Sequence, residues 1–132
     1  MRDFGDEPVD EAAMRRAAGV ALAVSDAPVR FGWLRDPARR RAYLDAIGAE
    51  HEPPELVVVL GDGSPGAAAA VQALLVALAA EGLGAHWTAA ATAAGIDVPP
   101  GLLPLGSVAV GIPAEPLRPL PPDDPAAGLL EW

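Results

Sequence analysis

Residues 70 to 87 read Ala70-Val-Gln-Ala-Leu-Leu-Val-Ala-Leu-Ala-Ala-Glu-Gly-Leu-Gly-Ala-His-Trp87, an apolar helix pattern that stops at a glycine and continues directly into a strand. Ser64 and Pro65 supply a cap and a first-turn proline for this helix, and Gly82 supplies the left-handed residue that ends it. We therefore expect a long helix over 65–82 followed by a strand over 83–89. The apolar run inside the helix predicts that it is buried.

Further elements are expected on both sides of this segment. The apolar or alternating stretches 28–34, 56–60 and 105–112 are typical of strands. Asp10 is placed to cap a helix over 11–24, and Asp36 with Pro37 to begin another over 36–48. In that second helix, Arg39, Arg40 and Arg41 are predicted to face water. A short, weak helical piece is predicted near 90–94.

The loop Gly61-Asp-Gly-Ser-Pro-Gly66 allows two interpretations. Its glycine spacing, after a strand and before a helix, matches the dinucleotide-binding fingerprint, and Glu81 lies about 20 residues further on. The fingerprint acid, however, belongs at the end of the next strand, whereas Glu81 falls at the end of the helix. Asp62 would also place a carboxylate beside a pyrophosphate. The loop is therefore interpreted as a plain strand-to-helix turn.

Composition excludes several classes of function. The 132 residues carry 18 acidic and 9 basic side chains, a net charge of -9, which argues against binding nucleic acid or anionic membranes through a basic face. The longest apolar run, 66–80, is shorter than the roughly 20 residues that span a bilayer. The chain has no cysteine, which fits a reducing compartment, and a cytoplasmic location is expected.

The chain shows no familiar catalytic or metal-binding constellation. The lack of cysteine rules out thiolate sites, and no Gly-x-Ser-x-Gly motif supports a nucleophilic serine. His51 lies among Glu50, Glu52 and Glu55, a pattern that is more typical of a solvated loop than of a ligand set. No metal site is predicted.

Three sequence segments together resemble the nitroreductase-like flavoproteins. They are the segment 70–87, the strand Gly106-Ser-Val-Ala-Val-Gly-Ile-Pro113 and the opening Met1-Arg-Asp-Phe-Gly-Asp-Glu-Pro-Val-Asp10. Within that family, the chain is most similar to the reductase domain fused to glutamyl ligases of deazaflavin-coenzyme biosynthesis. The resemblance implies one α+β domain over 1–132, a sandwich with a mainly antiparallel sheet of about four strands covered by three main helices. It also implies an intertwined homodimer with the 66–82 helix near the interface and an extended, proline-rich tail at 113–132.

The resemblance further implies a bound FMN and names the residues that would hold it. The strand 84–89 would lie along the flavin, with Gly84, Trp87, Thr88 and Ala89 near the ring. Arg2 and Arg118 would be the cations available to the phosphate, and His86 a possible proton donor to a reduced substrate. From the residues alone, core packing is the commoner role for a tryptophan such as Trp87, and a hydrogen-bonded core or surface position is the commoner one for a histidine such as His86.

The chain also departs from the family pattern where the family holds the flavin. The Arg-Arg-Ser run that family members carry just ahead of the opening segment is not present, and only Arg118 matches the paired basic residues of the tail. The loop before the first strand, 24–28, is too short to cover the flavin edge. Two hypotheses follow. One is a minimal oxidoreductase that uses FMN to pass hydride between a nicotinamide or deazaflavin donor and a small organic acceptor. The other is a cofactor-free homologue that acts as a partner subunit, docking on a larger chain of the family, or as a small-ligand scaffold.

Overall fold

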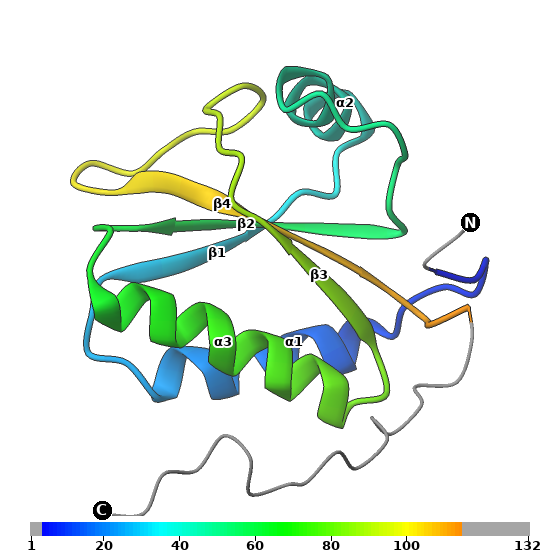
Figure 1. Cartoon of the computed structure of the whole chain (residues 1–132), viewed down its shortest axis with the longest axis horizontal. Coiled ribbons are helices and arrows are strands. Elements are labelled where there is room, and N and C mark those ends of the chain that lie inside the picture. Colours follow the sequence, from blue (N-terminus) through cyan, green and yellow to red (C-terminus); the bar gives the residue numbers. More distant parts are fainter. Residues whose placement is uncertain (1–3, 115–132) are drawn as a thin grey trace, which may run out of the picture.

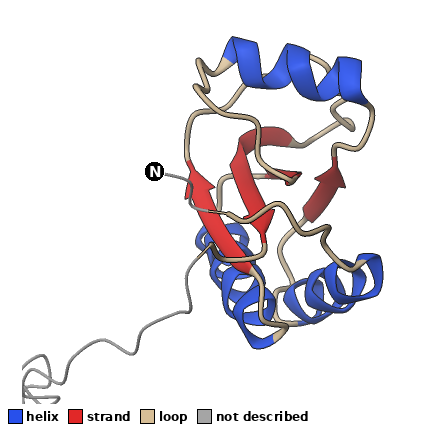
Figure 2. Cartoon of the chain, turned by 90° about the vertical axis from the view of Figure 1, so that its right-hand side faces the viewer, coloured by secondary structure: helices blue, strands red, loops and turns tan. Residues whose placement is uncertain are grey.

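The computed structural model describes residues 4–114, and these residues form three layers. A four-stranded sheet lies in the middle, with two helices on one face and one helix on the other (Figures 1 and 2). In chain order the elements are α1 (Glu11–Ala23), β1 (Val29–Trp33), α2 (Pro37–Ala46), β2 (Glu55–Gly61), α3 (Pro65–Ala80), β3 (Gly84–Thr88) and β4 (Leu103–Gly111). The α+β class expected from the sequence is thus confirmed.

The sheet is antiparallel throughout, with the strand order β1-β2-β4-β3. β2 and β4 occupy the centre, which explains why β2 is an unbroken apolar run: it is covered on both faces. β3 and β1 form the two edges. In β2, Val57 and Val59 face α1 and α3, whereas Leu56, Val58 and Leu60 face α2.

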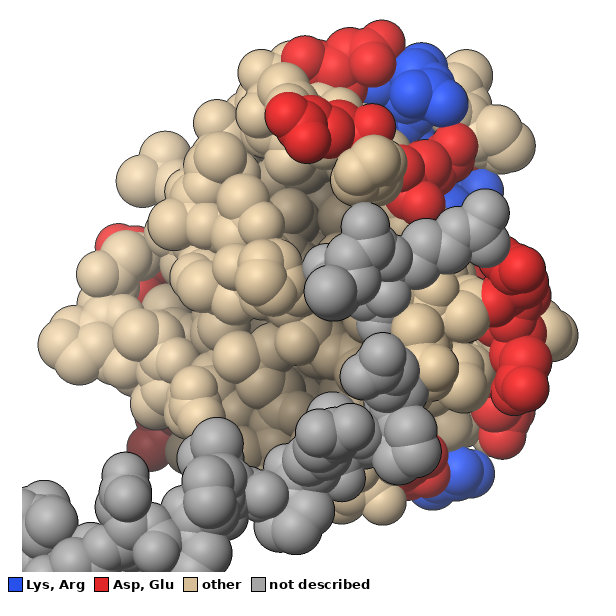
Figure 3. All heavy atoms as spheres, turned by 45° about the vertical axis from the view of Figure 1, so that its right-hand side comes forward, with Lys and Arg blue, Asp and Glu red and all other residues tan. Residues whose placement is uncertain are grey.

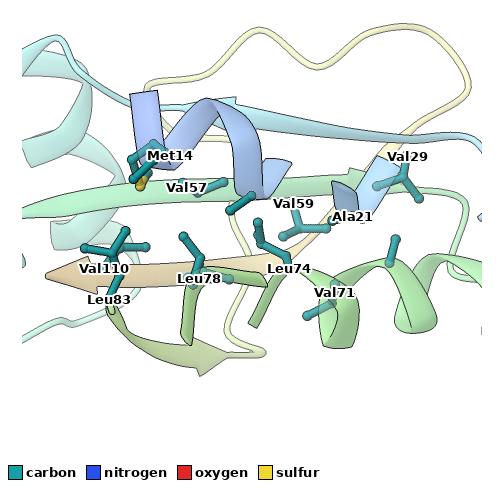
Figure 4. Close-up of a cluster of buried hydrophobic side chains, with 14 of the residues drawn as sticks. Met14, Ala21, Val29, Val57, Val59, Val71, Leu74, Leu78, Leu83 and Val110 are labelled. Atoms are coloured by element: carbon teal, nitrogen blue, oxygen red, sulfur yellow. The ribbon is translucent and has the colours of Figure 1, made fainter. Parts of the chain in front are cut away.

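The larger core lies between the sheet and the helix pair α1–α3 (Figure 4). α3 contributes Leu74 and Leu78, which pack against Val59 and Val110 of the central strands. Small residues on the facing side of α1, such as Ala17 and Ala21, let the two helices pack closely. Arg16, near the middle of α1, donates two hydrogen bonds of 2.8 and 2.9 Å to Glu81 at the end of α3.

The smaller core lies under α2. Tyr43 and Leu44 project from this helix onto Leu56, Val58 and Leu60 of β2. The segment between β3 and β4 closes the layer by packing Ile96, Val98 and Leu102 against the same cluster. Among the described residues, α2 is thus the one helix on its face of the sheet (Figures 1 and 2).

The helix signals in the sequence act as expected. Side chains of Asp10, Asp36 and Ser64 accept hydrogen bonds from backbone amides in the first turn of α1, α2 and α3. Pro65 begins α3, and Gly82 follows it with a φ of 78°. Strand and helix bounds agree with the expected ranges to within about two residues.

Two expectations were wrong. Residues 90–94 do not form a helix: the Thr92 hydroxyl accepts a hydrogen bond from the Ala94 amide at 3.1 Å, and the chain turns at Gly95. Side-chain capping of this kind competes with helical hydrogen bonding. Arg40 does not face water either, since its side chain is only 14% exposed and bonds to backbone carbonyl groups.

The proline-rich tail falls almost wholly outside the described residues, which end at Ala114. Its first residues pass close to the start of the described chain, where Phe4 forms a bridge with Pro113 and Gly5 donates to the Ile112 carbonyl at 2.8 Å. Within residues 4–114, no helix combines the length and apolar character that a membrane crossing requires.

Candidate functional site

A pocket of about 580 Å³ opens where α2 leaves the sheet uncovered. The opening segment, the end of α2, the loop before β2 and one face of three strands surround it. The described residues that line it are Phe4, Gly5, Asp6, Leu44, Ile47, Ala49, His51, Glu52, Pro53, Pro54, Leu56, His86, Thr88, Ser107 and Ala109. Pockets of this size accommodate small-molecule ligands and cofactors, so this is the candidate site.

The floor of the pocket follows from the strand register. His86 lies opposite Ala109, which lies opposite Leu56, so one row of side chains crosses β3, β4 and β2. In the next row, Thr88 lies opposite Ser107. Because side chains in a strand alternate between faces, these residues all point to the α2 side. The floor is thus polar toward β3 and apolar toward β2.

Arg40 holds the loop that forms one wall. Its guanidinium donates to the carbonyl oxygens of Pro53 at 3.3 Å and Pro54 at 3.1 Å, and to Leu34 at 3.1 Å. It also pairs with Glu55 at 3.4 Å. Several donors in a fixed plane suit arginine for this task. One buried side chain therefore ties α2 to the loop that carries Pro53 and Pro54 into the pocket wall.

The charged groups at the pocket are mostly acidic. Of the described lining residues, Asp6 and Glu52 are carboxylates, and none is lysine or arginine. Glu52 is compensated by Arg41 at 3.1 Å and more distantly by Arg40 at 3.8 Å. Acidic side chains gather along the top and right-hand edge of the surface in Figure 3. The described residues therefore offer no cation to an anionic group inside the pocket.

Two buried side chains with hydroxyl groups, Tyr43 and Ser107, lie at or next to the pocket floor. Tyr43 is 0% exposed and its hydroxyl forms no hydrogen bond of acceptable geometry, while Ser107 is 2% exposed and lines the pocket. Burial raises the pKa of the Tyr43 hydroxyl, and its interaction with the Ser107 side chain opposes that shift. Sequence reasoning missed both residues, because Tyr43 on α2 and Ser107 on β4 are far apart in the sequence and only folding brings them to the same site.

The residues predicted from the family resemblance fall into three groups. His86 and Thr88 line the pocket. Gly84, Trp87 and Ala89 do not appear among its lining residues. Arg2 and Arg118 lie outside the described residues.

Trp87 belongs to the opposite side of the sheet. Its side chain packs against the larger core, and its ring lies over Gly106, where an added Cβ would come within 2.6 Å of the indole. Gly84 is also closely packed: an added Cβ there would lie 3.1 Å from Phe4 and 3.3 Å from Pro113. The side chains of β3 are thus divided between core packing and the pocket.

The glycine loop forms a turn, as interpreted from the sequence. Asp62 accepts a hydrogen bond from the Ser64 amide at 3.0 Å. Hydrogen bonds from the Ser64 side chain and backbone hold the pKa of Asp62 below its ordinary range. An added Cβ at Gly61 would meet Leu105 at 2.8 Å, and one at Gly66 would meet Ala27 at 2.9 Å. Close packing therefore accounts for these glycines. Among the described residues, no group of three or more His, Asp or Glu side chains is arranged to hold a metal.

Comparison with known proteins identifies the fold. A scan against protein-family models finds no match. Among solved structures, a protein of Parabacteroides distasonis assigned as an NADH dehydrogenase/NAD(P)H nitroreductase matches with a TM-score of 0.76 and 24% identity, over 89% of this chain and 83% of that one. Nitroreductase A of Vibrio parahaemolyticus matches with a TM-score of 0.76 and 16% identity, over 92% of this chain and 67% of that one.

A third match was solved in complex with FMN. This protein of Desulfovibrio desulfuricans, assigned as a nitroreductase, has a TM-score of 0.71 and 23% identity, over 100% of this chain and 91% of that one. At these identities the likeness establishes architecture, and the chain has the nitroreductase-like fold.

Proposed function

We propose that this protein, with its nitroreductase-like fold, is an oxidoreductase that binds FMN in the pocket beside α2. The observation that carries the proposal is the pocket floor, where His86, Thr88 and Ser107 place polar groups on the face of β3 and β4. A solved nitroreductase of the same fold was crystallised with FMN. When bound, a flavin supplies hydride transfer, and the protein supplies binding and orientation.

The described residues fit the flavin ring. The cavity of about 580 Å³ lies within the range of cofactor sites. Leu44, Ile47 and Leu56 offer an apolar wall to a planar ring system. Thr88 and Ser107 offer hydroxyl groups to its polar edge. His86, exposed at the pocket, is placed to hold a proton near a bound acceptor.

The phosphate needs cations that the described lining residues do not include. A phosphate group carries between one and two negative charges at neutral pH and is normally met by arginine, lysine or several amide donors. We assign this role to Arg2 and Arg118, or to arginines of a second subunit. A nicotinamide or deazaflavin donor and a small organic acceptor complete the proposed reaction.

A homodimer belongs to the same proposal. α3 carries no charged residue over its 16 positions, and Ala69, Gln72 and Val76 form part of its exposed side. Val76 is 60% exposed. Because an uncharged helix surface can pack against its own copy across a two-fold axis, a second copy of the chain is the proposed partner.

A second candidate function is a cofactor-free scaffold that binds a small ligand or docks on a partner chain. The observation that favours it is that no lysine or arginine is among the described residues that line the pocket. Burying a phosphate without a paired cation is unfavourable.

A flavin-binding experiment separates the two candidates. The purified chain is incubated with FMN or riboflavin, desalted and examined for the visible flavin band. Retained FMN, lost in Arg118→Ala but kept in Arg30→Ala, would support the oxidoreductase. Arg30 is a suitable control because it lies on β1, the opposite edge of the sheet from β3. Retention of neither flavin by a folded protein would overturn the FMN proposal and favour the scaffold.

A further inference from the structure

We propose that Tyr43 and Ser107 form a coupled hydroxyl pair that donates a hydrogen bond to a neutral carbonyl oxygen or ring nitrogen of a planar ligand in the pocket. The identity of that ligand, the flavin ring, rests on the proposed function. The pair itself rests on three observations. Ser107 lines the pocket, and it lies opposite Val58, which packs in one cluster with Tyr43. The Tyr43 hydroxyl is buried without a hydrogen bond of acceptable geometry.

Burial makes this pair costly unless it has a purpose. An unpaired buried hydroxyl loses its water hydrogen bonds without compensation, so native structures rarely keep one. Within residues 4–114, Tyr43 carries the single buried side-chain polar atom left without such a bond. Phenylalanine would fill the same space against Leu44 and Val58 without that cost. The hydroxyl therefore points to a role beyond packing.

The donor count of the pair favours a ligand acceptor. In the structure, the Tyr43 hydroxyl has no hydrogen bond of acceptable geometry. A ligand that accepts a hydrogen bond from Ser107 would orient the Ser107 oxygen to accept the one proton that Tyr43 can donate. Ser107 then keeps its own proton for a group in the pocket. Because burial raises the pKa of the Tyr43 hydroxyl, the phenol stays protonated and keeps its donor role at neutral pH. The pair thus presents one directed donor at the polar side of the floor.

The surrounding charges select the kind of acceptor. No lysine or arginine is among the described residues that line the pocket, which disfavours an anionic group there. Thr88 lies opposite Ser107 in the register and adds a second hydroxyl beside it. A neutral carbonyl or ring nitrogen on a flat heteroaromatic ligand fits this arrangement of hydroxyl donors and apolar wall.

The chain allows a direct test because Tyr43 is its only tyrosine. Tyrosine labelled with a carbon isotope at Cζ gives one NMR signal, which reports the hydrogen bonding of the Tyr43 hydroxyl. Riboflavin, which lacks the phosphate, is titrated into the wild-type chain. We expect the signal to move on binding in the wild type and to stay unchanged in Ser107→Ala. The wild-type measurement does not depend on the folding of any variant.

Affinities provide the second readout. Riboflavin binding, followed by quenching of its fluorescence, should weaken about 5- to 10-fold in Tyr43→Phe and in Ser107→Ala. The double variant should bind no more weakly than Ser107→Ala, because the two hydroxyls act as one unit. Ser64→Ala is the control: it removes a hydroxyl that caps α3 and should leave riboflavin affinity unchanged.

The possible failures are distinct. If the wild type binds riboflavin, but its tyrosine signal does not move and the variants bind equally well, the hydroxyl pair is only structural and this inference is overturned. The proposed function would then still stand. If the wild type binds neither riboflavin nor FMN, the proposed function fails and the ligand assignment of the pair fails with it.

Discussion

His86 and Trp87 are neighbours on β3 but belong to opposite layers: His86 lines the pocket beside α2, and Trp87 packs against the core beneath α1 and α3. The alternation of strand side chains causes this division. It means that adjacent substitutions test different properties of the protein. Substitution of Trp87 should change stability, and substitution of His86 should change chemistry at the site.

Replacing Trp87 with leucine should lower the free energy of unfolding by about 1 to 3 kcal/mol, because it leaves a cavity beside Gly106 and the core. Flavin affinity should not change, since the indole lies on the far side of the sheet from the pocket. Urea unfolding followed by tryptophan fluorescence of the remaining indoles measures the first effect. A loss of riboflavin binding in the folded variant would contradict this placement.

His86→Gln should have the reverse effect. His86 is exposed, so the unfolding free energy should stay within about 0.5 kcal/mol of the wild type. If His86 supplies a proton to the reduced product, reoxidation of the flavin-loaded protein by a small quinone should slow by roughly 100-fold. Stopped-flow absorbance measures this rate. An unchanged rate would remove His86 from the proposed chemistry.

The wall of the pocket depends on Arg40. Arg40→Gln removes the hydrogen bonds to Pro53 and Pro54 and leaves Glu55 without that partner, which should cost about 2 kcal/mol of unfolding free energy. The adjacent substitution Arg41→Gln breaks only exposed ion pairs and should cost less than about 1 kcal/mol. Equal losses in chemical denaturation would show that Arg40 does not hold the loop.

Stability should also depend on pH through Glu81. Hydrogen bonds from Arg16 hold the pKa of Glu81 below its ordinary range. A lowered pKa in the folded state stabilises the protein above the unfolded pKa, about 4.3, and this stabilisation is lost as pH falls through the folded value. Wild type should therefore melt above Glu81→Gln at pH 7, and the gap should close below about pH 4. A gap in melting temperature that stays constant across this range would argue against the pairing.

Local signals made much of the fold predictable. A cap at Asp10 or Ser64 and a stop at Gly82 act within one helical turn, so the sequence alone carries them. β2 was recognisable because a strand covered on both faces is apolar without interruption, here from Leu56 to Leu60. The helix expected at 90–94 failed because a single hydroxyl, from Thr92, captured a backbone amide that the helix needed.

The site was less predictable because it depends on contacts between distant segments. Arg40 looks like its exposed neighbours in the sequence, and only the docking of α2 beside the 53–54 carbonyl groups buries it. Tyr43 and Ser107 are brought together because α2 packs on β2 and Ser107 lies opposite Val58 of that strand, which no spacing in the sequence encodes. His86 and Thr88 were found only through the family resemblance, although their alternation with Trp87 could have separated them from the core-facing residues of β3.

The proposed dimer is tested on α3. Val76→Glu places a charge in the middle of an exposed, uncharged helix surface, and burying that charge between two copies would be strongly unfavourable. The variant should sediment as a folded monomer where the wild type sediments as a dimer. Leu103→Glu is the matched control, because Leu103 is also 60% exposed but belongs to β4 and not to the α3 surface. If both variants stay dimeric, the α3 surface is not the interface. If both become monomeric, added charge alone separates the subunits and α3 has no special role.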